Sequence, residues 1–508
     1  MKKIYLLAVL AAMTVVVNAA TEGRWTYTTD GHSATVTKYT PPVDLLAWAK
    51  THPGEWPKMF VDAVPATLGG KPVTAIGDGA FENVIGLVAL DLPTTINRIG
   101  KRAFYNCIPL NGRLDLRQVT EVGDSAFCNT SDPLLYFQAQ PGVLKLGKGA
   151  FLNTNNPNGL DVDAAKALFS VFWGDDDPVE PEDPDDPDEV SCTGSVLVPF
   201  LMLDAYKNAF AANEGDPLYY HAQEECIFGA EYAANNVVYR AEGIWEGQPG
   251  QWSLDNGYWA TGEVTVPDEL HNAPVNEIPD DAFLLIDPAT AALLGCGNVS
   301  NTRLTGINLG ENISIIFDNA FFGCTGLKKL DLKNTFEVCE FAFANCNNIE
   351  EIHLRRPAED CYLNKLCFAD IDLAAYWLYM MSSYMPITPE PEMPDITKVI
   401  PATVYVPKGE LQNYIDWHAY KSDYDGEPDG PLYGFFKAGR LLEEGDTPHP
   451  GVRGDLTGEG VVDVDDLNYV INIMVHKADA IPAADINGDG SVDVDDLNIV
   501  INIMVHKE

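Results

Sequence analysis

Basic residues are scarce in this chain, and that scarcity excludes several functions. The 508 residues include 32 Lys and Arg against 75 Asp and Glu, which gives a formal charge of −43. A surface this acidic repels nucleic-acid phosphates and anionic lipids, so neither is an expected partner. The acidic excess either keeps an exported protein soluble or binds cations, and we interpret most of it as serving solubility.

Long apolar runs are also missing after the first twenty residues. Lys2 and Lys3 precede the run IYLLAVLAAMTVVV, and NAA follows it, which is the pattern of a secretory signal peptide at residues 1–19, cleaved after Ala19 or Ala20. The run is short for a spanning helix, and no second one follows. We therefore expect a secreted protein, extracellular or associated with the cell surface, without membrane insertion.

Catalytic and redox motifs are absent too. The chain has no H-E-x-x-H, G-x-S-x-G, P-loop or dinucleotide-binding pattern, and its nine His do not fall at metal-binding spacing. Its ten Cys contain no C-x-x-C pair, and their pairing stays open. Because repeats and caps occupy nearly all residues, no room is left for a catalytic barrel of about 250 residues. We expect no enzymatic activity.

One repeated unit accounts for most of the sequence. A pattern close to I-G-x-x-A-F ends at Phe residues 22 to 25 positions apart, except that one step of 38 indicates an insertion within residues 284–300. The repeated residues are Phe81, Phe104, Phe127 and Phe151 in a first array and Phe283, Phe321, Phe343 and Phe368 in a second. A period of this size means stacked units that bury a shared core.

Short alternating runs such as LVALDLP and LKKLDL lie between the repeated Phe residues and have the period of a strand. One strand per repeat predicts an α/β fold class with a β-rich parallel ladder, whose interior the Ala-Phe pairs fill. Cys107, Cys324 and Cys346 each follow a repeated Phe by three residues. We interpret them as a packed column of small residues, not as a metal or redox site.

Both arrays begin and end alike. Residues 24–39 and 250–267 are aromatic and turn-rich, which predicts capping hairpins. VLVPFLMLDAYKNAF and VYVPKGELQNYIDW close the arrays, each after an apolar helix-like stretch and a Pro-rich acidic insert. We infer a tandem duplication over residues 20–232 and 233–446. Six Trp residues near the array starts are interpreted as buried caps, with sugar stacking as the alternative: Trp25, Trp48, Trp56, Trp245, Trp252 and Trp259.

The I-G-x-x-A-F unit, closed by V-x-V-P and a Tyr-bearing helix, resembles the BspA-like leucine-rich repeat family of secreted bacterial proteins. The resemblance covers about four fifths of the chain. It implies two curved solenoids in tandem that bind surfaces, matrix proteins or other macromolecules without chemistry. The long inserts and the irregular steps of the second array depart from the family pattern.

A second kind of repeat follows the linker at residues 447–454. From residues 461 and 491 onward, two copies agree at 15 of 17 positions. Each copy fits an acidic loop whose oxygens at positions 1, 3, 5, 7, 9 and 12 surround a hard cation. The predicted ligands are Asp455, Thr457, Glu459, the Val461 carbonyl, Asp463 and Asp466, and then Asp485, Asn487, Asp489, the Ser491 carbonyl, Asp493 and Asp496. We expect two Ca²⁺ sites, weaker in the first loop, and a segment that needs the metal to fold.

Behind each loop, Leu, Val, Ile and Met recur at helical spacing, whereas Pro lies upstream, so a helix leaves each loop but none enters. This arrangement over residues 455–508 resembles type I dockerins, small all-α calcium-binding domains that attach proteins to a cohesin-bearing scaffold. The resemblance implies partner recognition at loop positions 10 and 11: Val464, Asp465, Val494 and Asp495. The identical pairs predict docking in two orientations. Alternatively, the equal helices serve only to pack on each other.

The sequence thus predicts a secreted, non-catalytic protein whose repeats recognise a macromolecule, protein or glycan, and whose dockerin binds a cohesin-like partner. A rival hypothesis makes it a component of a polysaccharide-degrading complex with glycoside hydrolase activity, because most dockerins carry such enzymes to fibre. A third hypothesis makes the C-terminal segment a calcium staple without an external partner.

Overall fold

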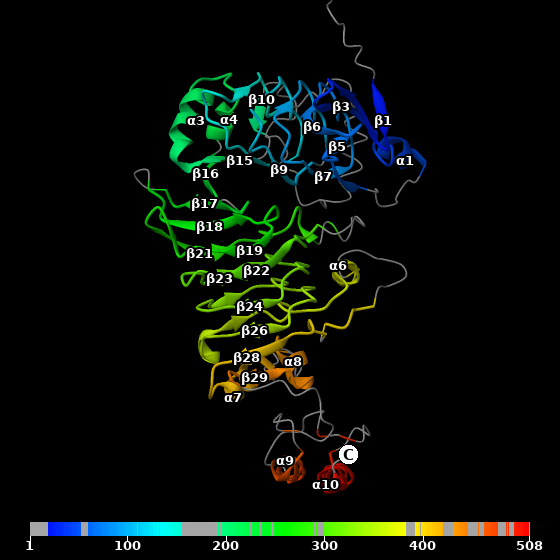
Figure 1. Cartoon of the computed structure of the whole chain (residues 1–508), viewed down its shortest axis with the longest axis vertical. Coiled ribbons are helices and arrows are strands. Elements are labelled where there is room, and N and C mark those ends of the chain that lie inside the picture. Colours follow the sequence, from blue (N-terminus) through cyan, green and yellow to red (C-terminus); the bar gives the residue numbers. More distant parts are fainter. Residues whose placement is uncertain are drawn as a thin grey trace, which may run out of the picture. The chain divides into compact units, whose positions relative to one another are not determined.

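The structure is a computed structural model and divides into two compact units between Gly229 and Ala230, close to the predicted division after residue 232 (Figure 1). Most of the predicted signal peptide and the acidic insert lie outside the described residues. The structure describes residues 19–51, 59–108, 110–131, 133–154, 190–192, 195–223, 225–233, 235–244, 248–288, 291, 299–382, 392–396, 398–419, 430–445, 456, 462–475, 484, 486 and 492–506.

Antiparallel strands open the first unit and confirm its predicted capping hairpin. They are β1 (Ala20–Glu22), β2 (Trp25–Thr29) and β3 (Ala34–Tyr39). The Asp30 carboxylate closes the turn between β2 and β3, because its Oδ1 accepts the N–H groups of His32 and Ser33 at 2.9 and 2.8 Å.

Each repeat contributes two short strands, so the prediction of one strand per repeat is wrong. The segments that lead into the I-G-x-x-A-F pattern, here called I-G segments, continue from β3 as a parallel ladder. Its strands are β6 (Lys71–Ile76), β8 (Arg98–Ile99), β10 (Glu121–Val122) and β12 (Lys145–Leu146). The L-x-L runs form β9 (Arg113–Asp115), β11 (Leu134–Tyr136) and β15 (Ser195–Pro199), and β4 (Phe60–Ala63) pairs with β7 (Leu87–Asp91), all in parallel. Most I-G strands have two residues, which is too short for an alternation signal.

The remaining elements of the first unit connect or close these ladders. They are α1 (Leu45–Thr51), β5 (Thr67–Leu68), the antiparallel pair β13 (Leu152–Thr154) and β14 (Val190–Cys192), η1 (Phe200–Met202), α3 (Leu203–Phe210) and α4 (Tyr219–Gln223).

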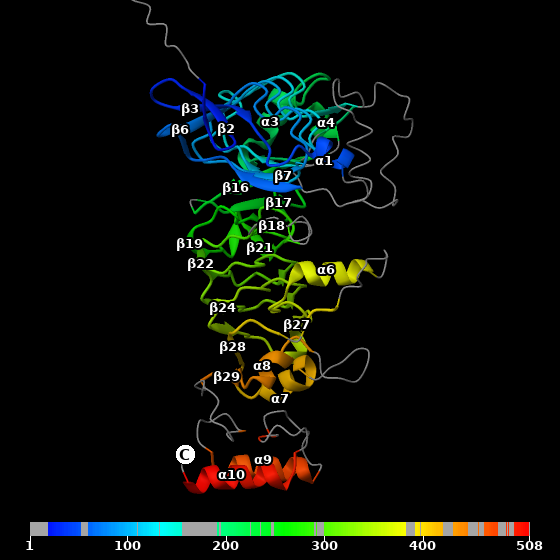
Figure 2. The same cartoon turned by 90° about the vertical axis from the view of Figure 1, so that its right-hand side faces the viewer.

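The second unit follows the same plan (Figure 2). Its I-G ladder is β21 (Ala273–Ile278), β23 (Ile315–Ile316), β25 (Glu337–Val338) and β27 (Tyr362–Leu363). Its L-x-L ladder is β24 (Lys329–Asp331), β26 (Glu351–His353), β28 (Thr403–Val406) and β29 (Leu441–Glu443). The other elements are β19 (Gly262–Thr265) paired with β22 (Leu304–Asn308), β20 (Glu269–Leu270), η2 (Ala358–Asp360), α6 (Leu373–Ser382), α7 (Leu411–Tyr414), the π-helix η3 (Ile415–Ala419) and α8 (Tyr433–Lys437).

The hairpin predicted at residues 250–267 is wrong in its pairing. The antiparallel strands that open the second unit are β16 (Ile227–Tyr232), β17 (Val238–Glu242) and β18 (Gln251–Asn256), whereas β19 pairs with β22. The chain turns a corner at Gly257 instead of folding back, and a Cβ there would lie 2.1 Å from the Phe283 ring. The Asn301 amide holds this corner by donating to the carbonyls of Gly257 and Ala260.

The repeated Phe residues form the predicted interior of each unit. Neighbouring rings stack with centroids 4.9, 5.0 and 5.6 Å apart in the first unit and 4.4, 4.9 and 5.9 Å apart in the second. Cys107, Cys324 and Cys346 are buried beside these stacks. Burial raises the pKa of the Cys346 thiol to about 12, and a protonated thiol is a poor nucleophile and ligand. The column therefore packs, as predicted; the eight Cys side chains described are free thiols.

The glycine of the I-G motif allows successive repeats to approach closely. At Gly123, an added Cβ would lie 2.4 Å from the backbone nitrogen of Lys101 in the preceding repeat. The Gly123 N–H donates to the Ile99 carbonyl at 2.9 Å. One turn therefore rests directly on the backbone of the previous one, which explains the recurrence of glycine at this position.

A tyrosine closes each array. After the V-x-V-P strand, the Tyr206 hydroxyl of α3 donates to the Ala139 carbonyl, and the Tyr414 hydroxyl of α7 donates to the Arg356 carbonyl at 2.8 Å. Both side chains are fully buried. The hydroxyl satisfies a carbonyl that no further repeat would reach, so the motif works as the expected cap.

Candidate functional site

The C-terminal copies form the two predicted helices, α9 (Val464–Met474) and α10 (Val494–His506), which pack side by side (Figure 2). Asp463 caps α9, because its Oδ1 accepts the N–H of Asp465 at 2.8 Å, and Asp466 reaches back to the N–H of Asp463 at 2.8 Å. This reciprocal capping box explains where α9 begins.

The last predicted ligand of each loop is a fully buried aspartate. Asp466 accepts the N–H groups of Leu456 at 2.6 Å and of Asp463 at 2.8 Å. Asp496 accepts the matching N–H groups of Ile486 at 2.7 Å and of Asp493 at 3.0 Å. Each carboxylate thus ties the start of its loop to the start of its helix, in the same way in both copies.

Four of the twelve predicted metal ligands lie within the described residues: Asp463, Asp466, Asp493 and Asp496. The other eight, Asp455, Thr457, Glu459, Val461, Asp485, Asn487, Asp489 and Ser491, lie outside them. Among the described side chains, no group of three His, Cys, Asp or Glu gathers as a metal site. The two calcium sites therefore stay predictions.

The residues predicted to meet a partner lie at the helix starts. Val464 and Val494 are 57% and 54% exposed, and Asp465 is exposed as well, while nothing is described of the Asp495 side chain. Ile471 and Ile501 are equivalent in the two copies and are each 38% exposed. The sequence did not predict that these two isoleucines are exposed, because helical spacing alone does not tell which apolar residues face the other helix.

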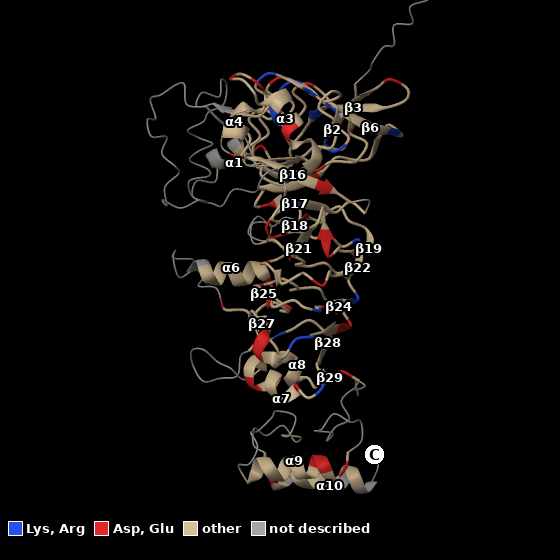
Figure 3. Ribbon diagram, turned by 90° about the vertical axis from the view of Figure 1, so that its left-hand side faces the viewer, with Lys and Arg blue, Asp and Glu red and all other residues tan. Residues whose placement is uncertain are grey.

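The outer face of the β24–β26–β28 sheet, opposite the buried Leu330 and Ile352, carries a network of charges. Figure 3 marks the positions of Lys, Arg, Asp and Glu along the ribbon. His353 lies between two glutamates, with Nδ1 at 2.7 Å from Glu444 and Nε2 at 3.3 Å from Glu351, and it stacks on Tyr405. Lys329 Nζ lies 2.6 Å from Glu351 and, followed by the His353 ring, lowers the pKa of that carboxyl. Such a face is polar and held in place by its own ion pairs.

A branch of this network ends at Arg355. Its guanidinium forms a bidentate pair with Asp331, at 2.7 and 3.0 Å, and contacts Glu444 at 2.5 Å. The Asp331 carboxylate raises the pKa of the Arg355 guanidinium. The face offers fixed charges to a partner, and its separate charged residues gave no motif in the sequence.

The described tryptophans near the array starts are buried or half-buried rather than exposed. Trp25, Trp252 and Trp259 are buried and Trp48 is half-buried. Burial supports capping over sugar stacking for Trp25, Trp252 and Trp259; Trp56 and Trp245 lie outside the described residues.

Comparison with known families matches residues 68–162 and 295–376 to the BspA type leucine rich repeat region, in six copies. These two segments are thus similar to BspA-type leucine-rich repeats. The matched residues contain all the repeated Phe residues except Phe283, so the repeat pattern and the parallel ladders agree with that match. Among the described residues, no helix has the length and apolarity that a bilayer span requires.

Several solved structures are similar to this chain. A leucine rich cell surface protein from Faecalibacterium prausnitzii is 18% identical, with 66% of this chain and 89% of that chain covered and a TM-score of 0.21. A leucine-rich repeat protein from Eubacterium ventriosum is 15% identical, with 65% and 70% covered and a TM-score of 0.22. The pneumococcal vaccine antigen PcpA is 12% identical, with 79% and 96% covered and a TM-score of 0.21. Comparison with curated proteins gives no match.

Proposed function

We propose that this chain is a secreted, non-catalytic binding protein, extracellular or associated with the cell surface. Its two leucine-rich-repeat units recognise a macromolecule, protein or glycan. Its C-terminal segment is a calcium-dependent type I dockerin that attaches the repeats to a cohesin-like domain. The two proposed functions correspond to the two kinds of internal repeat. The leucine-rich repeats form the binding surface, and the C-terminal copies form the attachment domain.

The main support for a calcium-dependent attachment domain is the matched pair of buried aspartates, Asp466 and Asp496. A fully buried carboxylate loses its hydration, and hydrogen bonds from backbone N–H groups offset part of that cost. A divalent cation bound by the loop oxygens would stabilise the buried charge further. Both copies make the same contacts at this aspartate, which supports one calcium loop in each copy.

The repeats supply the recognition surface. Their interiors are filled by stacked Phe rings, so ligands meet only the outside of each unit. The charged outer face around His353 and Arg355 is fixed by hydrogen bonds of 2.5 to 3.3 Å. Fixed complementary charges give a binding surface specificity more than affinity.

A pull-down of the full chain on a panel of immobilised type I cohesin domains tests the attachment. We expect retention in calcium and loss in EDTA, and loss for the double variant Asp466→Asn, Asp496→Asn in calcium. Asp204→Asn, which changes an exposed acid in α3, is the matched control and should be retained. Retention that is indifferent to EDTA would contradict the proposal.

Two further outcomes separate the rival functions. Calcium binding without retention by any cohesin would favour the calcium staple. Turnover of plant polysaccharides by the purified chain would overturn the non-catalytic assignment and favour the glycoside hydrolase hypothesis.

A further inference from the structure

Two insertions of the second unit leave the repeat at the same place. Each departs directly after a repeated Phe and returns through one antiparallel bridge, Leu284 with Ser300 and Ala369 with Val399. Two uninterrupted repeats, ending at Phe321 and Phe343, lie between them. Insertions in repeat proteins gather on one side, and that side is often the binding side.

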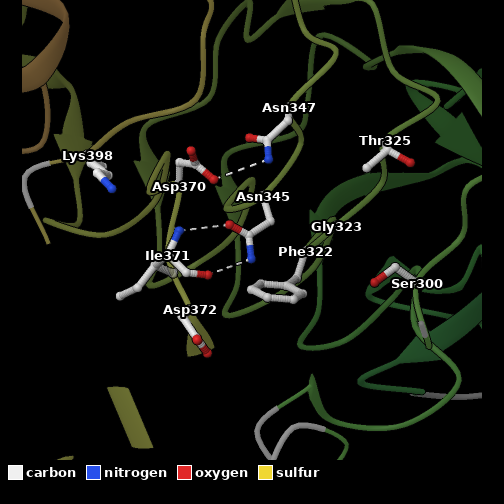
Figure 4. A pocket seen from close by; sticks show the side chains of 10 residues that line it. All are labelled: Ser300, Phe322, Gly323, Thr325, Asn345, Asn347, Asp370, Ile371, Asp372 and Lys398. Atoms are coloured by element: carbon white, nitrogen blue, oxygen red, sulfur yellow. Dashed lines mark hydrogen bonds between the residues drawn. The ribbon is translucent and has the colours of Figure 1, made fainter. Parts of the chain in front are cut away.

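An open pocket of about 520 Å³ lies between the bases of these insertions (Figure 4). Its floor is made by the turns that follow Phe321 and Phe343. One wall is the returning end of the first insertion, and the other is the two ends of the second. The lining residues are Ser300, Phe322, Gly323, Thr325, Asn345, Asn347, Asp370, Ile371, Asp372 and Lys398.

The pocket is held in shape by hydrogen bonds between repeats. The Asn345 amide pairs with the backbone of Ile371 in both directions, at 2.9 and 3.0 Å, and Asn347 donates to Asp370 at 3.2 Å (Figure 4). Gly323 has a φ of +64°, and a Cβ there would lie 2.7 Å from the Ser300 hydroxyl. The floor therefore fits closely against the wall before any ligand arrives, which lowers the ordering cost of binding.

The lining combines polar groups with an apolar ring. Asn347, Asp370 and Asp372 offer planar amide and carboxylate groups, the Lys398 ammonium group adds donors, and the hydroxyls of Ser300 and Thr325 both donate and accept. Phe322 belongs to an apolar cluster that includes Tyr376 and Trp377 of α6. An aromatic face beside paired amide and carboxylate groups suits a molecule with an apolar C–H face and a rim of hydroxyls.

Other ligand classes fit this lining less well. Two carboxylates against one ammonium group repel an anion. The polar groups would lose hydrogen bonds to a purely apolar ligand. The lining residues come almost entirely from turns and loops, so they present no strand edge on which a peptide could add.

We propose that this pocket binds an uncharged oligosaccharide, with Phe322 as the stacking face and Asn347, Asp370 and Asp372 as hydroxyl partners. The inference rests on the proposed binding function of the repeats and names one ligand class and one site for it.

Isothermal titration of the full chain with uncharged hexasaccharides of glucose, xylose and mannose tests the assignment. We expect at least one to bind, Phe322→Ala and Asn347→Ala each to weaken it about tenfold, and Phe322→Tyr to restore it. Asn413→Ala is the matched control, because Asn413 is also exposed and donates to a carboxylate, Glu410, at 3.0 Å. The Asn413→Ala variant should bind the hexasaccharide with the same affinity as the unchanged chain.

Circular dichroism on each variant separates lost binding from lost folding. Absence of binding by every hexasaccharide overturns the proposal, as does equal affinity in Asn347→Ala, or a preference for an anionic glycan such as heparin. If the repeats capture a protein ligand while no hexasaccharide binds, the pocket assignment fails and the proposed binding function stands.

Discussion

Replacing Phe321 by Ala removes one ring from the interior stack of the second unit. Phe321 is fully buried, and its ring centroid lies 4.4 Å from that of Phe283 and 4.9 Å from that of Phe343. A buried Phe→Ala change costs about 3–5 kcal/mol, because a cavity is left behind. Each lost aromatic pair adds about 0.5–1.5 kcal/mol beyond area burial. With two pairs lost, we expect a cost near 5 kcal/mol, comparable to the whole stability of many domains.

Urea unfolding followed by hydrogen exchange and mass spectrometry checks this expectation, because it reports each repeat separately. Repeats contact only their neighbours, so exchange should rise around Phe321 and leave the first unit unchanged. Phe336→Ala is the control: Phe336 lies in the same unit but is 37% exposed, and its loss should cost about 1 kcal/mol or less. Equal destabilisation by both variants would refute the assignment of the repeated Phe residues as the core.

Three other perturbations give distinct expected results. Gly123→Ala should destabilise the first unit by about 1–3 kcal/mol in urea titrations, because the new Cβ meets the preceding repeat; an unchanged midpoint would contradict this. Burial, and then the Asp318 carboxylate, raise the pKa of Asp280. The second unit should therefore lose stability as pH rises through that raised value. Asp280→Asn should flatten this dependence of stability on pH, which hydrogen exchange at several pH values measures. Calcium chelation should increase exchange in α9 and α10 but not in the repeats, and Asp496→Asn should reduce the calcium stoichiometry from two to one by calorimetry; two sites in this variant would exclude its role as a ligand.

The sequence was sufficient for the parts of the fold that repeat. The spacing of Phe81, Phe104 and later residues identified the interior, since a residue that recurs once per unit must occupy equivalent positions. The second strand of each repeat was not predictable from alternation, because pairs such as Arg98 and Ile99 are too short. The corner at Gly257 was missed because it depends on the Phe283 ring, which arrives from the following repeat.

The two candidate sites also differ in how far the sequence predicts them. The acidic loops could be assigned from local spacing, because all ligands of one loop lie within twelve residues. The pocket could not, because it needs Phe322, Asn347 and Asp372 from three successive repeats. The sequence showed the insertions only as departures from the period. That both leave at the same turn is visible once the bridges at Ser300 and Val399 are known.

Stacking of the repeats also lines up charged residues at one repeat position, so that they form a column in each unit. Three residues before the repeated Phe, an acid accepts the N–H of the equivalent residue in the next repeat, as Asp78 does from Lys101 and Asp280 does from Asp318, both at 2.9 Å. In the first unit, the Lys101 ammonium group, followed by the Lys148 N–H, lowers the pKa of Asp124. Asp280, Asp318 and Glu340 instead stack like charges in the second unit, and burial followed by Asp318 raises the pKa of Glu340. Acid should therefore weaken the first column, where Asp124 loses its ion pair below its lowered pKa, and strengthen the second.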